Sequence, residues 1–560
     1  MTLATPSPGQ SSLDRRRFLA AVAGLVGLAA AAQTPVGRAV AAPRLEGGRY
    51  PFRLGVASGD PTPTGVVLWT RLAPRPFVRG GGMPNVRVPV HWELAEDEGF
   101  HSIVRSGAVW ALAELAHSVH VDLEGLKPGR EYYYRFWYRD DVSRVGRTRT
   151  APDLGAPIRR MNFAFASCQD WASGYYPSYG HMAEEDLDLV LHLGDYVYEG
   201  GIPANGGYRN VPVPETLRGA PRTLERWRMQ YALFKSDPQL QLAHARFPWA
   251  VTWDDHEVQN DYANDQSQYE GDISALRAAA YQAWYEHQPV RRPAKPDADG
   301  PRIFRRLQWG RLAQIDVVDG RQYRSIPPCG WGEAPACQAA YDPDITMLGR
   351  GQERWLYAGH RDSVAQWNVM ASNVMMARLE HEPVDGARLW HDAYDGFPAA
   401  RNRLIGSWLR HELRNPVVVT GDWHSTFVND IHRNFDREGS PRVGTEFVGS
   451  SISSNGDVPV YGPYYGPMIP FNPHIKFFDG DRRGYVRCSL TTEQWRTDLR
   501  MVTTVSTPDA PQYTYASFVV RNGVPGAQQI TGPVCGRYPE RPAPGATGKG
   551  GPTGKGGPTG

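Results

Sequence analysis

Four short clusters of residues that can bind metals stand in the middle of the sequence, and each follows a run of apolar residues. The clusters are Ser167-Cys168-Gln169-Asp170, Gly194-Asp195-Tyr196-Val197-Tyr198-Glu199, Trp253-Asp254-Asp255-His256-Glu257 and Gly421-Asp422-Trp423-His424. A lone aspartate after a strand usually caps or turns the chain, but four clusters in one segment favour a shared role. Because ligands bind beyond the carboxyl ends of strands in α/β sheets, we expect these side chains to form one site.

Three of these side chains favour a transition metal. Cys168 offers a thiolate, which a bound metal keeps deprotonated, and His424 offers a neutral imidazole. Tyr198 lies three residues after Asp195, and a phenolate favours a hard ion of high charge such as ferric iron. These residue types therefore predict one transition-metal position.

The aspartates predict harder cations beside that position. Asp195 can bridge two cations through its two carboxylate oxygens, and Asp255 and Asp422 supply hard oxygens that suit Ca²⁺, Mg²⁺ or Mn²⁺. A centre with one transition metal and one or two hard cations clamps a phosphoryl group and activates a water. The predicted chemistry is therefore phosphoryl transfer to water, with Asp195 essential for catalysis.

The elements that must position these clusters alternate between strands and helices from Met161 onward. Amphipathic helices are predicted at 222–235 and 273–286. Strands are predicted at 162–166, 187–193, 249–253, 312–318 and 416–420. This alternation implies a layered α/β core, which we bound at residues 160–505.

The preceding segment, residues 50–152, has short aromatic-rich strands such as Gly65–Thr70, Val88–Leu94 and Tyr132–Tyr138. Alternating polarity suits half-buried strands, and Val121–Arg130 resembles the strand-turn corner of a fibronectin-type sandwich. We therefore predict an antiparallel β-sandwich domain of the fibronectin or immunoglobulin type. It contains no cluster of catalytic residue types, so we expect it to pack against or shield the core.

The two ends of the chain are expected to lie outside these domains. Residues 1–41 combine the basic run Arg15-Arg16-Arg17, a 15-residue apolar run at 18–32 and the small-residue site Ala39-Val40-Ala41. This is the pattern of a twin-arginine signal peptide, and the alternative, a membrane anchor, needs about 20 apolar residues. The pattern predicts a secreted protein without a transmembrane segment. At the other end we distinguish a C-terminal segment at 506–544 and a solvated Gly/Pro/Thr/Lys tail at 545–560.

The charge balance argues against a nucleic-acid partner. The 560 residues include 61 Lys and Arg against 59 Asp and Glu, a net charge of +2, so there is no basic surplus to bind a phosphate backbone. Residues 1–41 hold four Arg and one Asp, so the chain without its signal has a net charge of −1. Hydrophobic residues make up 41% of the chain, which supports a large core. We expect a monomer.

The four clusters together resemble those of the PhoD-type alkaline phosphatase family. Further matches are Val56-Ala57-Ser58-Gly59-Asp60-Pro61, Arg321-Gln322-Tyr323-Arg324, Asp395-Gly396-Phe397-Pro398 and Asn472-Pro473-His474-Ile475-Lys476-Phe477. The resemblance runs from about residue 51 to 505, nearly the whole chain after the signal. It implies a β-sandwich followed by a metallophosphoesterase core similar to that of purple acid phosphatases.

The resemblance also implies Fe³⁺ together with one or two Ca²⁺, with Mn²⁺, Mg²⁺ and Zn²⁺ left open. Iron would take Cys168, Asp195, Tyr198 and His424, while calcium would share Asp195 and take Asp255 and Asp422. His256 stands where the wider superfamily keeps a histidine beside a metal-binding Asn, and it would act as general acid or orient the phosphate. Asp255 replaces that Asn, and the adjacent Asp254 is an alternative ligand.

Four other residues are candidates for the surroundings of the metals or for substrate contacts. Near the strand at 367–373 the superfamily usually offers a His, and Asn373 is the only polar candidate for that place. Arg324 belongs to one of the matching motifs. His244 and His474 are weaker candidates, with structural roles as the alternative.

The predicted function is a secreted, metal-dependent alkaline phosphatase that hydrolyses phosphate mono- and diesters. The alternative is a phospholipase D-type phosphodiesterase that cleaves phospholipid head groups. That alternative needs an apolar surface beside the metals. The aromatic segments Tyr461–Met468 and Gly330-Trp331-Gly332 could form such a surface, and the other possibility is that their rings stack within loops. A surface binding protein with a catalytically inactive core would be expected to lack one of the principal metal ligands, and none of them is missing from the sequence. A serine hydrolase is disfavoured because no G-x-S-x-G elbow occurs.

The five cysteines allow two disulfides and one free thiol. Cys329 and Cys337 are eight positions apart, a plausible local disulfide in an exported protein, and Cys488 and Cys535 are a second candidate pair. Cys168 is then left over, as an iron ligand must be.

Overall fold

The computed structural model describes residues 50–297, 300–382 and 388–533. All of these belong to one compact unit that spans Arg44–Gly560. The predicted signal at 1–41, Cys535 and the tail at 545–560 lie outside the described residues. The predictions for those segments therefore stay predictions.

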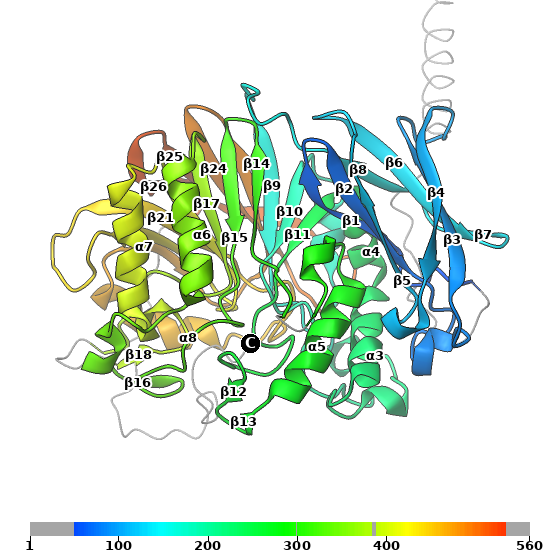
Figure 1. Cartoon of the computed structure of the whole chain (residues 1–560). Coiled ribbons are helices and arrows are strands. Elements are labelled where there is room, and N and C mark those ends of the chain that lie inside the picture. Colours follow the sequence, from blue (N-terminus) through cyan, green and yellow to red (C-terminus); the bar gives the residue numbers. More distant parts are fainter. Residues whose placement is uncertain (1–49, 298–299, 383–387, 534–560) are drawn as a thin grey trace, which may run out of the picture. The chain divides into compact units, whose positions relative to one another are not determined.

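Two large sheets form the core of the described unit (Figure 1). In spatial order the ten-stranded sheet contains β26 (Val524–Thr531), β25 (Gln512–Arg521), β24 (Gln494–Val502), β23 (Arg483–Leu490), β9 (Met161–Ala166), β10 (Leu189–His192), β11 (Pro248–Val251), β1 (Val56–Thr62), β2 (Gly65–Arg71) and β5 (Ser118–Leu123). The seven-stranded sheet contains β14 (Arg305–Trp309), β15 (Ala313–Val317), β17 (Trp367–Ser372), β19 (Pro416–Thr420), β21 (Arg442–Val448), β20 (Thr426–His432) and β22 (Ile475–Asp479).

The centre of each sheet is parallel. β9, β10 and β11 run in one direction, with Leu189 opposite Phe163 and Val190 opposite Trp249. β15, β17, β19 and β21 do the same in the other sheet. Parallel strands bring their carboxyl ends to one edge of a sheet, so the loops after β9, β10, β11 and β19 are positioned to share a site.

Helices cover the outer faces of both sheets, as the predicted α/β class requires. Apolar side chains such as Phe165, Leu191, Ile315 and Val419 fill the space between the two sheets. The outer face of the ten-stranded sheet packs on α2 (Pro177–Met182), α3 (Leu224–Lys235), α4 (Pro238–Arg246) and α5 (Ser274–His287). The outer face of the seven-stranded sheet packs on α6 (Gly349–Asp362) and α7 (Pro398–Arg410). The helices predicted at 222–235 and 273–286 are α3 and α5.

Local signals explain where the covering helices begin. The Thr223 hydroxyl accepts a hydrogen bond from the Arg226 backbone N–H at the start of α3, as an N-cap residue does. Asp237 caps α4 through the N–H groups of Gln239 and Leu240, and Pro238 occupies the first turn, where its missing N–H costs nothing. These caps fix two helices directly behind the ligand loops.

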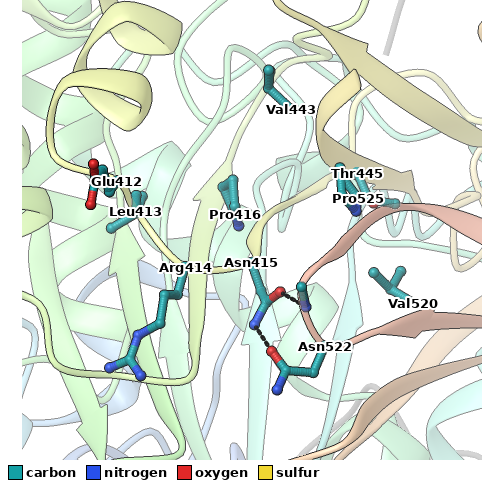
Figure 2. Close-up of a pocket in the computed structure, with 11 residues that line it drawn as sticks. Glu412, Leu413, Arg414, Asn415, Pro416, Val443, Thr445, Val520, Asn522 and Pro525 are labelled. Atoms are coloured by element: carbon teal, nitrogen blue, oxygen red, sulfur yellow. Dashed lines mark hydrogen bonds between the residues drawn. The ribbon is translucent and has the colours of Figure 1, made fainter. Parts of the chain in front are cut away.

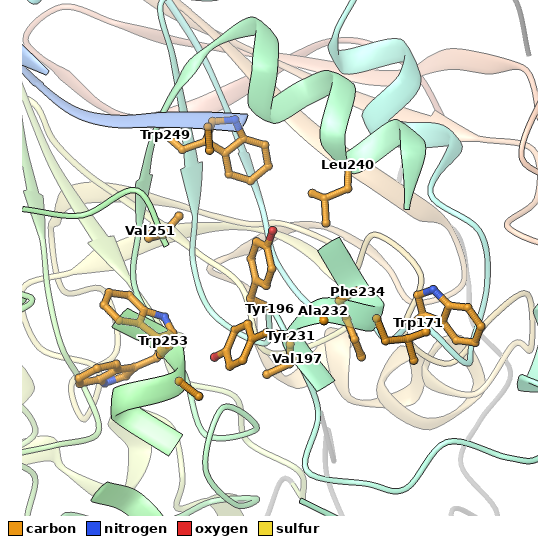
Figure 3. Packing of buried hydrophobic residues seen from close by; sticks show 14 of the residues in the cluster. Trp171, Tyr196, Val197, Tyr231, Ala232, Phe234, Leu240, Trp249, Val251 and Trp253 are labelled. Carbon is orange, nitrogen blue, oxygen red and sulfur yellow. The ribbon is translucent and has the colours of Figure 1, made fainter. Parts of the chain in front are cut away.

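A layer of buried aromatic rings lies between those helices and the ten-stranded sheet (Figure 3). Tyr196, in the loop after β10, contacts the ring of Tyr231 from α3 at 6.2 Å. The Trp253 ring, after β11, stacks on Tyr281 from α5 at 4.1 Å. The large area these rings bury anchors the ligand loops to the helices.

The N-terminal antiparallel sheet contains β3 (Val88–Ala95), β4 (Ile103–Ala111), β6 (Glu131–Tyr138), β7 (Asp141–Val142) and β8 (Gly146–Arg149). Its inner side chains, including Val90, Leu94 and Phe136, pack on β1, β2 and β5. Antiparallel strands were predicted here, but β1 also pairs in parallel with β11. One layer of the sandwich is therefore continuous with the core sheet, which a local strand pattern cannot reveal.

The core sheet continues beyond residue 505, where we placed the end of the catalytic domain. β25 pairs with β24 and β26 pairs with β25, both antiparallel. Residues 512–531 thus extend the ten-stranded sheet, with β26 at its edge, and are not a separate segment. Their Pro and Gly residues obscured the strand pattern, because the turn glycine Gly523 and the bulged Gly526 have φ angles of +76° and +100°.

The structure joins Cys329 to Cys337 in a disulfide, as predicted. Cys488 is buried in β23 with a free thiol, and its Sγ lies 3.9 Å from the Thr497 hydroxyl. Among the residues the structure describes, no helix combines the length and the apolar character needed to cross a membrane.

His360 on α6 makes stability depend on pH. Its side chain is buried, with Nδ1 2.9 Å from the Ser407 hydroxyl, and burial, followed by the charge of Arg306, lowers its pKa to about 3. A folded pKa below the unfolded value contributes stability that is present above about pH 6.5 and is lost as pH falls. We expect wild-type protein to lose about 1.4 kcal/mol more than His360→Gln between pH 7.5 and 5.5. Urea unfolding at both pH values measures this, and equal losses would contradict it.

Candidate metal centre

The ligand loops leave their strands with an unusual backbone. Cys168 follows β9, Asp195 follows β10, and Asp422 and His424 follow β19, and these four residues have φ angles of +58°, +55°, +69° and +48°. Non-glycine residues in this left-handed region cost about 1–2 kcal/mol each. Strained backbone conformations are frequent at functional sites. Here the left-handed conformation directs each of these side chains toward the shared edge of the sheets.

The predicted iron ligands lie together. One candidate ligand atom from each of Cys168, Asp195 and His424 lies within 4.8 Å of the other two. The Tyr198 hydroxyl donates to Asp195 Oδ2 at 3.2 Å and lies 3.3 Å from His424 Nε2. Burial, then the charge of Arg483, lowers the pKa of His424 to about 3, so its imidazole is neutral and able to bind a metal.

The predicted calcium ligands form two further groups next to the first. Asp195 groups with Asp255 and His256, and Asp255 also groups with Asp254 and Asp422, again within 4.8 Å. Asp195 and Asp255 thus each belong to two groups. The sequence left open whether Asp254 or Asp255 is the metal ligand. In the structure both carboxylates belong to the same group, so both are candidate ligands.

The buried carboxylates of this cluster give it a negative charge that suits the binding of metal cations. Within the described residues, Asp195 Oδ1, Asp254 Oδ2, Asp255 Oδ1 and Asp422 Oδ2 are buried without a hydrogen-bond partner. Buried polar atoms rarely lack partners unless a water or an ion supplies one. Burial, with the neighbouring carboxylates, raises the pKa of Asp195 and of Asp422 well above the usual range. Divalent or trivalent ions would relieve this repulsion, and carboxylate, thiolate, phenolate and imidazole are suitable donors for them.

Arg321 and Asp392 extend the cluster in a way that the sequence did not reveal. Arg321 Nε donates to Asp254 Oδ1 at 2.5 Å, and its Nη1 donates to Asp392 Oδ1 at 2.7 Å. Asp392 Oδ2 is buried and unpartnered within the described residues, so it is a further candidate ligand. It follows the three-residue strand β18 (Arg388–Trp390), which is too short to give a strand signal.

Glu257 holds two of the ligand loops at a fixed separation. Its Oε2 accepts the backbone N–H groups of Asp195 at 3.0 Å and Asp254 at 2.8 Å, and its Oε1 accepts that of Tyr196 at 2.7 Å. The side chain is 1% exposed. One buried carboxylate therefore ties the loop after β10 to the loop after β11.

We expect Glu257→Gln to weaken metal binding about 10–100-fold, the usual cost of losing a group that orients a ligand. The Gln amide nitrogen cannot accept a hydrogen bond, so at least one of the three N–H groups loses its partner. Calcium titration of metal-depleted protein measures this. Wild-type affinity in the variant would show that the bonds to Glu257 do not set the loop separation.

His256 is oriented by a carboxylate. Its Nδ1 lies 2.6 Å from Glu199 Oε2, and its ring stacks on Tyr198 at 4.5 Å. Burial acts to lower the pKa of His256, but Glu199, Asp255 and Asp195 outweigh it and raise the pKa well above 6.5. Its Nε2 is buried without a hydrogen bond within the described residues and lies 3.9 Å from Asp255 Oδ2. A protonated imidazole held this way can donate a proton at Nε2.

Comparisons with known proteins show to which family the chain belongs. Residues 163–499 match the family described as PhoD-like phosphatase, and residues 38–152 match its N-terminal domain. The chain belongs to the PhoD-like phosphatase family. Alkaline phosphatase D of Bacillus subtilis (strain 168) is 43% identical over 532 residues, which cover 93% of this chain and 90% of that protein. A solved structure described as "Structure of PhoD" has a TM-score of 0.81 and 42% identity, and the match covers 89% of this chain and 95% of that one.

Membership of the PhoD-like phosphatases confirms the predicted family and enzyme class, a phosphoric ester hydrolase. The coarse fold, an α/β core with N-terminal antiparallel strands, is confirmed as well.

Two of the four candidates for the surroundings of the metals, Arg324 and Asn373, support the site from close by. Arg324 Nη2 pairs with Asp392 and donates to the Asp261 carbonyl oxygen at 2.8 Å. Asn373 donates through Nδ2 to the Trp253 carbonyl oxygen and accepts the Gly320 N–H at 2.8 Å. Both residues brace ligand loops through backbone groups.

The two histidine candidates have contacts elsewhere. His244 stacks on Trp249 at 3.9 Å and meets the Tyr196 hydroxyl at 2.7 Å, behind the ligand loop. His474 meets the Arg378 carbonyl oxygen at 2.6 Å, and its ring contacts Phe435. We therefore assign both to packing.

A surface pocket of about 390 Å³ lies at the start of β19, away from its carboxyl end (Figure 2). Asn415 donates to Asn522 Oδ1 at 2.9 Å and accepts the Gly523 N–H at 2.7 Å, so its amide is satisfied. The pocket lining contains neither imidazole nor thiol. We therefore place the functional site at the carboxyl ends of the strands and not in this pocket.

Proposed function

We propose that this PhoD-like phosphatase is a secreted, metal-dependent enzyme that hydrolyses phosphate monoesters and diesters at the cluster around Asp195. The observation that carries the proposal is the convergence of three ligand groups, of which Asp195 links the first to the second and Asp255 links the second to the third. Its relative is named alkaline phosphatase D, and a multi-metal centre suits ester hydrolysis.

The proposed metals are iron and calcium. Cys168, Asp195, Tyr198 and His424 would hold iron, while Asp195, Asp255 and Asp422 would hold calcium, with Asp254 and Asp392 able to complete a second calcium position. When bound, these ions would neutralise the phosphate oxygens and make a water more acidic.

Side chains of the protein orient His256 and supply the proton that the leaving group needs. Glu199 accepts from His256 Nδ1 and leaves Nε2 free to protonate the departing alkoxide. The Tyr198 ring stacks on the face of this imidazole and limits its rotation. Ser454 meets the Tyr198 hydroxyl at 2.6 Å, and Asn455 holds His424 at Nδ1.

The contacts of the described residues do not favour the phospholipase D-type alternative. Most of the aromatic segment Tyr461–Met468, which could have formed an apolar approach, is buried instead. Tyr461 and Tyr465 are 2% and 0% exposed, and Tyr465 packs on Trp423 at 5.1 Å. Gly330 and Gly332 contact His391 through their carbonyl oxygens.

Turnover of p-nitrophenyl phosphate and bis(p-nitrophenyl) phosphate by purified protein tests the proposed activity. We expect both esters to be hydrolysed and chelation to stop both reactions. Hydrolysis that persists after complete metal removal, or none of either ester with iron and calcium present, would overturn the proposal.

Export is proposed from the arginine run and is consistent with the Cys329–Cys337 disulfide, since disulfides persist in oxidising compartments. We expect Arg16→Lys with Arg17→Lys to retain the protein inside the cell, because the twin-arginine signal is read by its receptor. Fractionation of a host with this pathway measures it. Undiminished secretion of the double variant would contradict this route.

A further inference from the structure

A serine-rich loop after β21 lies beside the proposed iron position. We call it the 450–456 loop, and it comprises Ser450-Ser451-Ile452-Ser453-Ser454-Asn455-Gly456. It belongs to no helix or strand, and all of its residues except Asn455 are buried. Because buried polar groups are normally hydrogen-bonded, the contacts of this loop indicate what it supports.

The 450–456 loop contacts two of the proposed iron ligands. The Cys168 carbonyl oxygen accepts the backbone N–H groups of Ser453 at 3.4 Å and Ser454 at 3.3 Å. The Ser454 hydroxyl lies 2.6 Å from the Tyr198 hydroxyl, which donates its own proton to Asp195 Oδ2. Ser454 is therefore the donor to the Tyr198 oxygen, and it can still donate when that oxygen binds a metal as a phenolate.

Arg483, at the start of β23, joins this loop to a third ligand, His424. Arg483 Nε donates to the Gly456 carbonyl oxygen at 2.9 Å, and its Nη1 donates to the His424 carbonyl oxygen at 3.2 Å. Asn455, next to Gly456, accepts a hydrogen bond from His424 Nδ1 through Oδ1. The proton on Nδ1 leaves Nε2 as the metal-binding nitrogen, so Arg483 and Asn455 together set where this nitrogen lies.

Stability alone does not explain a guanidinium at this position. Arg483 is 2% exposed, and within the described residues its hydrogen bonds all go to backbone carbonyl oxygens, those of His424, Gly456 and Arg482. A buried cation that is not bonded to a carboxylate is costly. Its contacts therefore favour a role in holding the ligand loops in place.

We propose that Arg483 is a positioning residue for the iron position and acts through the 450–456 loop. This inference rests on the proposed assignment of iron and calcium and deepens it. In the described part of the chain, no hydrogen bond joins Arg483 or the loop to Asp254, Asp255 or Asp422. Disturbing Arg483 should therefore weaken iron binding and leave calcium binding unchanged.

Arg483→Lys in the purified protein tests this. Lysine keeps the positive charge, but a single ammonium group does not reproduce the guanidinium fork that reaches two carbonyl oxygens. We expect iron affinity, measured by competition with a chelator, to fall about 10-fold or more, the usual cost of losing a group that orients a ligand. Calcium affinity, measured by titration, should stay at the wild-type value.

Arg324→Lys is a matched control with the opposite expectation. Arg324 is also 2% exposed and also donates to a carbonyl oxygen, that of Asp261, but it pairs with Asp392, a proposed calcium ligand. This variant should weaken calcium binding and leave iron binding unchanged.

Ser454→Ala tests the 450–456 loop while Arg483 stays in place. The variant removes the hydrogen bond to the Tyr198 oxygen, so the phenolate becomes a stronger electron donor to the metal. We expect the visible absorption band from phenolate-to-Fe³⁺ charge transfer to move to longer wavelength. A loss of stability without a change at the ligand would not move this band.

Wild-type iron affinity in Arg483→Lys, or an equal fall of its iron and calcium affinities, would overturn the inference. If Arg483→Lys does not fold, an unmoved absorption band in Ser454→Ala would overturn it. Wild-type protein that binds calcium but no iron would contradict the proposed iron assignment itself, whatever the variants do.

Discussion

Asp195→Asn is expected to lower turnover of phosphate esters by about 10³-fold or more. Asp195 belongs both to the group with Cys168 and His424 and to the group with Asp255 and His256. Replacing one carboxylate oxygen by an amide nitrogen removes a charge and a ligand atom from both groups at once. Iron and calcium content should therefore fall together, which elemental analysis of the purified variant measures alongside its kinetics.

A matched control for this variant is Asp188→Asn. Asp188 precedes β10 at its opposite end, where it pairs with Arg149 and accepts the Asn162 N–H. It should keep near-wild-type metal content and turnover. Full activity in Asp195→Asn, or loss of only one of the two metals, would contradict a shared ligand.

Removal of the metals is expected to abolish activity and to lower the melting temperature by about 3–5 °C. The four unpartnered carboxylate oxygens are buried, and an uncompensated buried charge costs about 3–5 kcal/mol. A chain of this size has an unfolding entropy of about 1 kcal/mol per degree. Calorimetry before and after chelation measures the change.

Restoration should need both kinds of metal. Iron alone would fill the group around Cys168 and His424, and calcium alone the group around Asp255 and Asp422. Full recovery of activity and melting temperature is expected only when both are added. An apoprotein as stable and as active as the holoprotein would contradict the reading of this cluster as a metal site.

The ligand clusters were predictable because they depend on local sequence. Cys168, Asp195, Asp255 and His424 each follow a strongly apolar strand, and parallel strands carry their following loops to one edge. The strand at 416–420 is predicted with the bounds of β19. Helix caps such as Asp237 are likewise local signals.

The features that were missed depend on contacts between distant segments. Glu257 appeared in a ligand motif, but its bonds to the loop after β10 need the pairing of β10 with β11. Asp392 reaches the site because Arg321 holds it from another loop. β25 pairs with the edge that β24 offers, and β26 then pairs with β25. No pattern within one segment encodes these partners.

The most direct test of the central claim is anomalous diffraction from crystals of the metal-loaded protein, measured on both sides of the iron absorption edge. We predict one iron peak bounded by Cys168 Sγ, the Tyr198 hydroxyl and His424 Nε2. We also predict at least one further cation without an iron signal among the carboxylates of Asp255 and Asp422. Absence of iron from the first position, or a single cation serving all of these ligands, would contradict it.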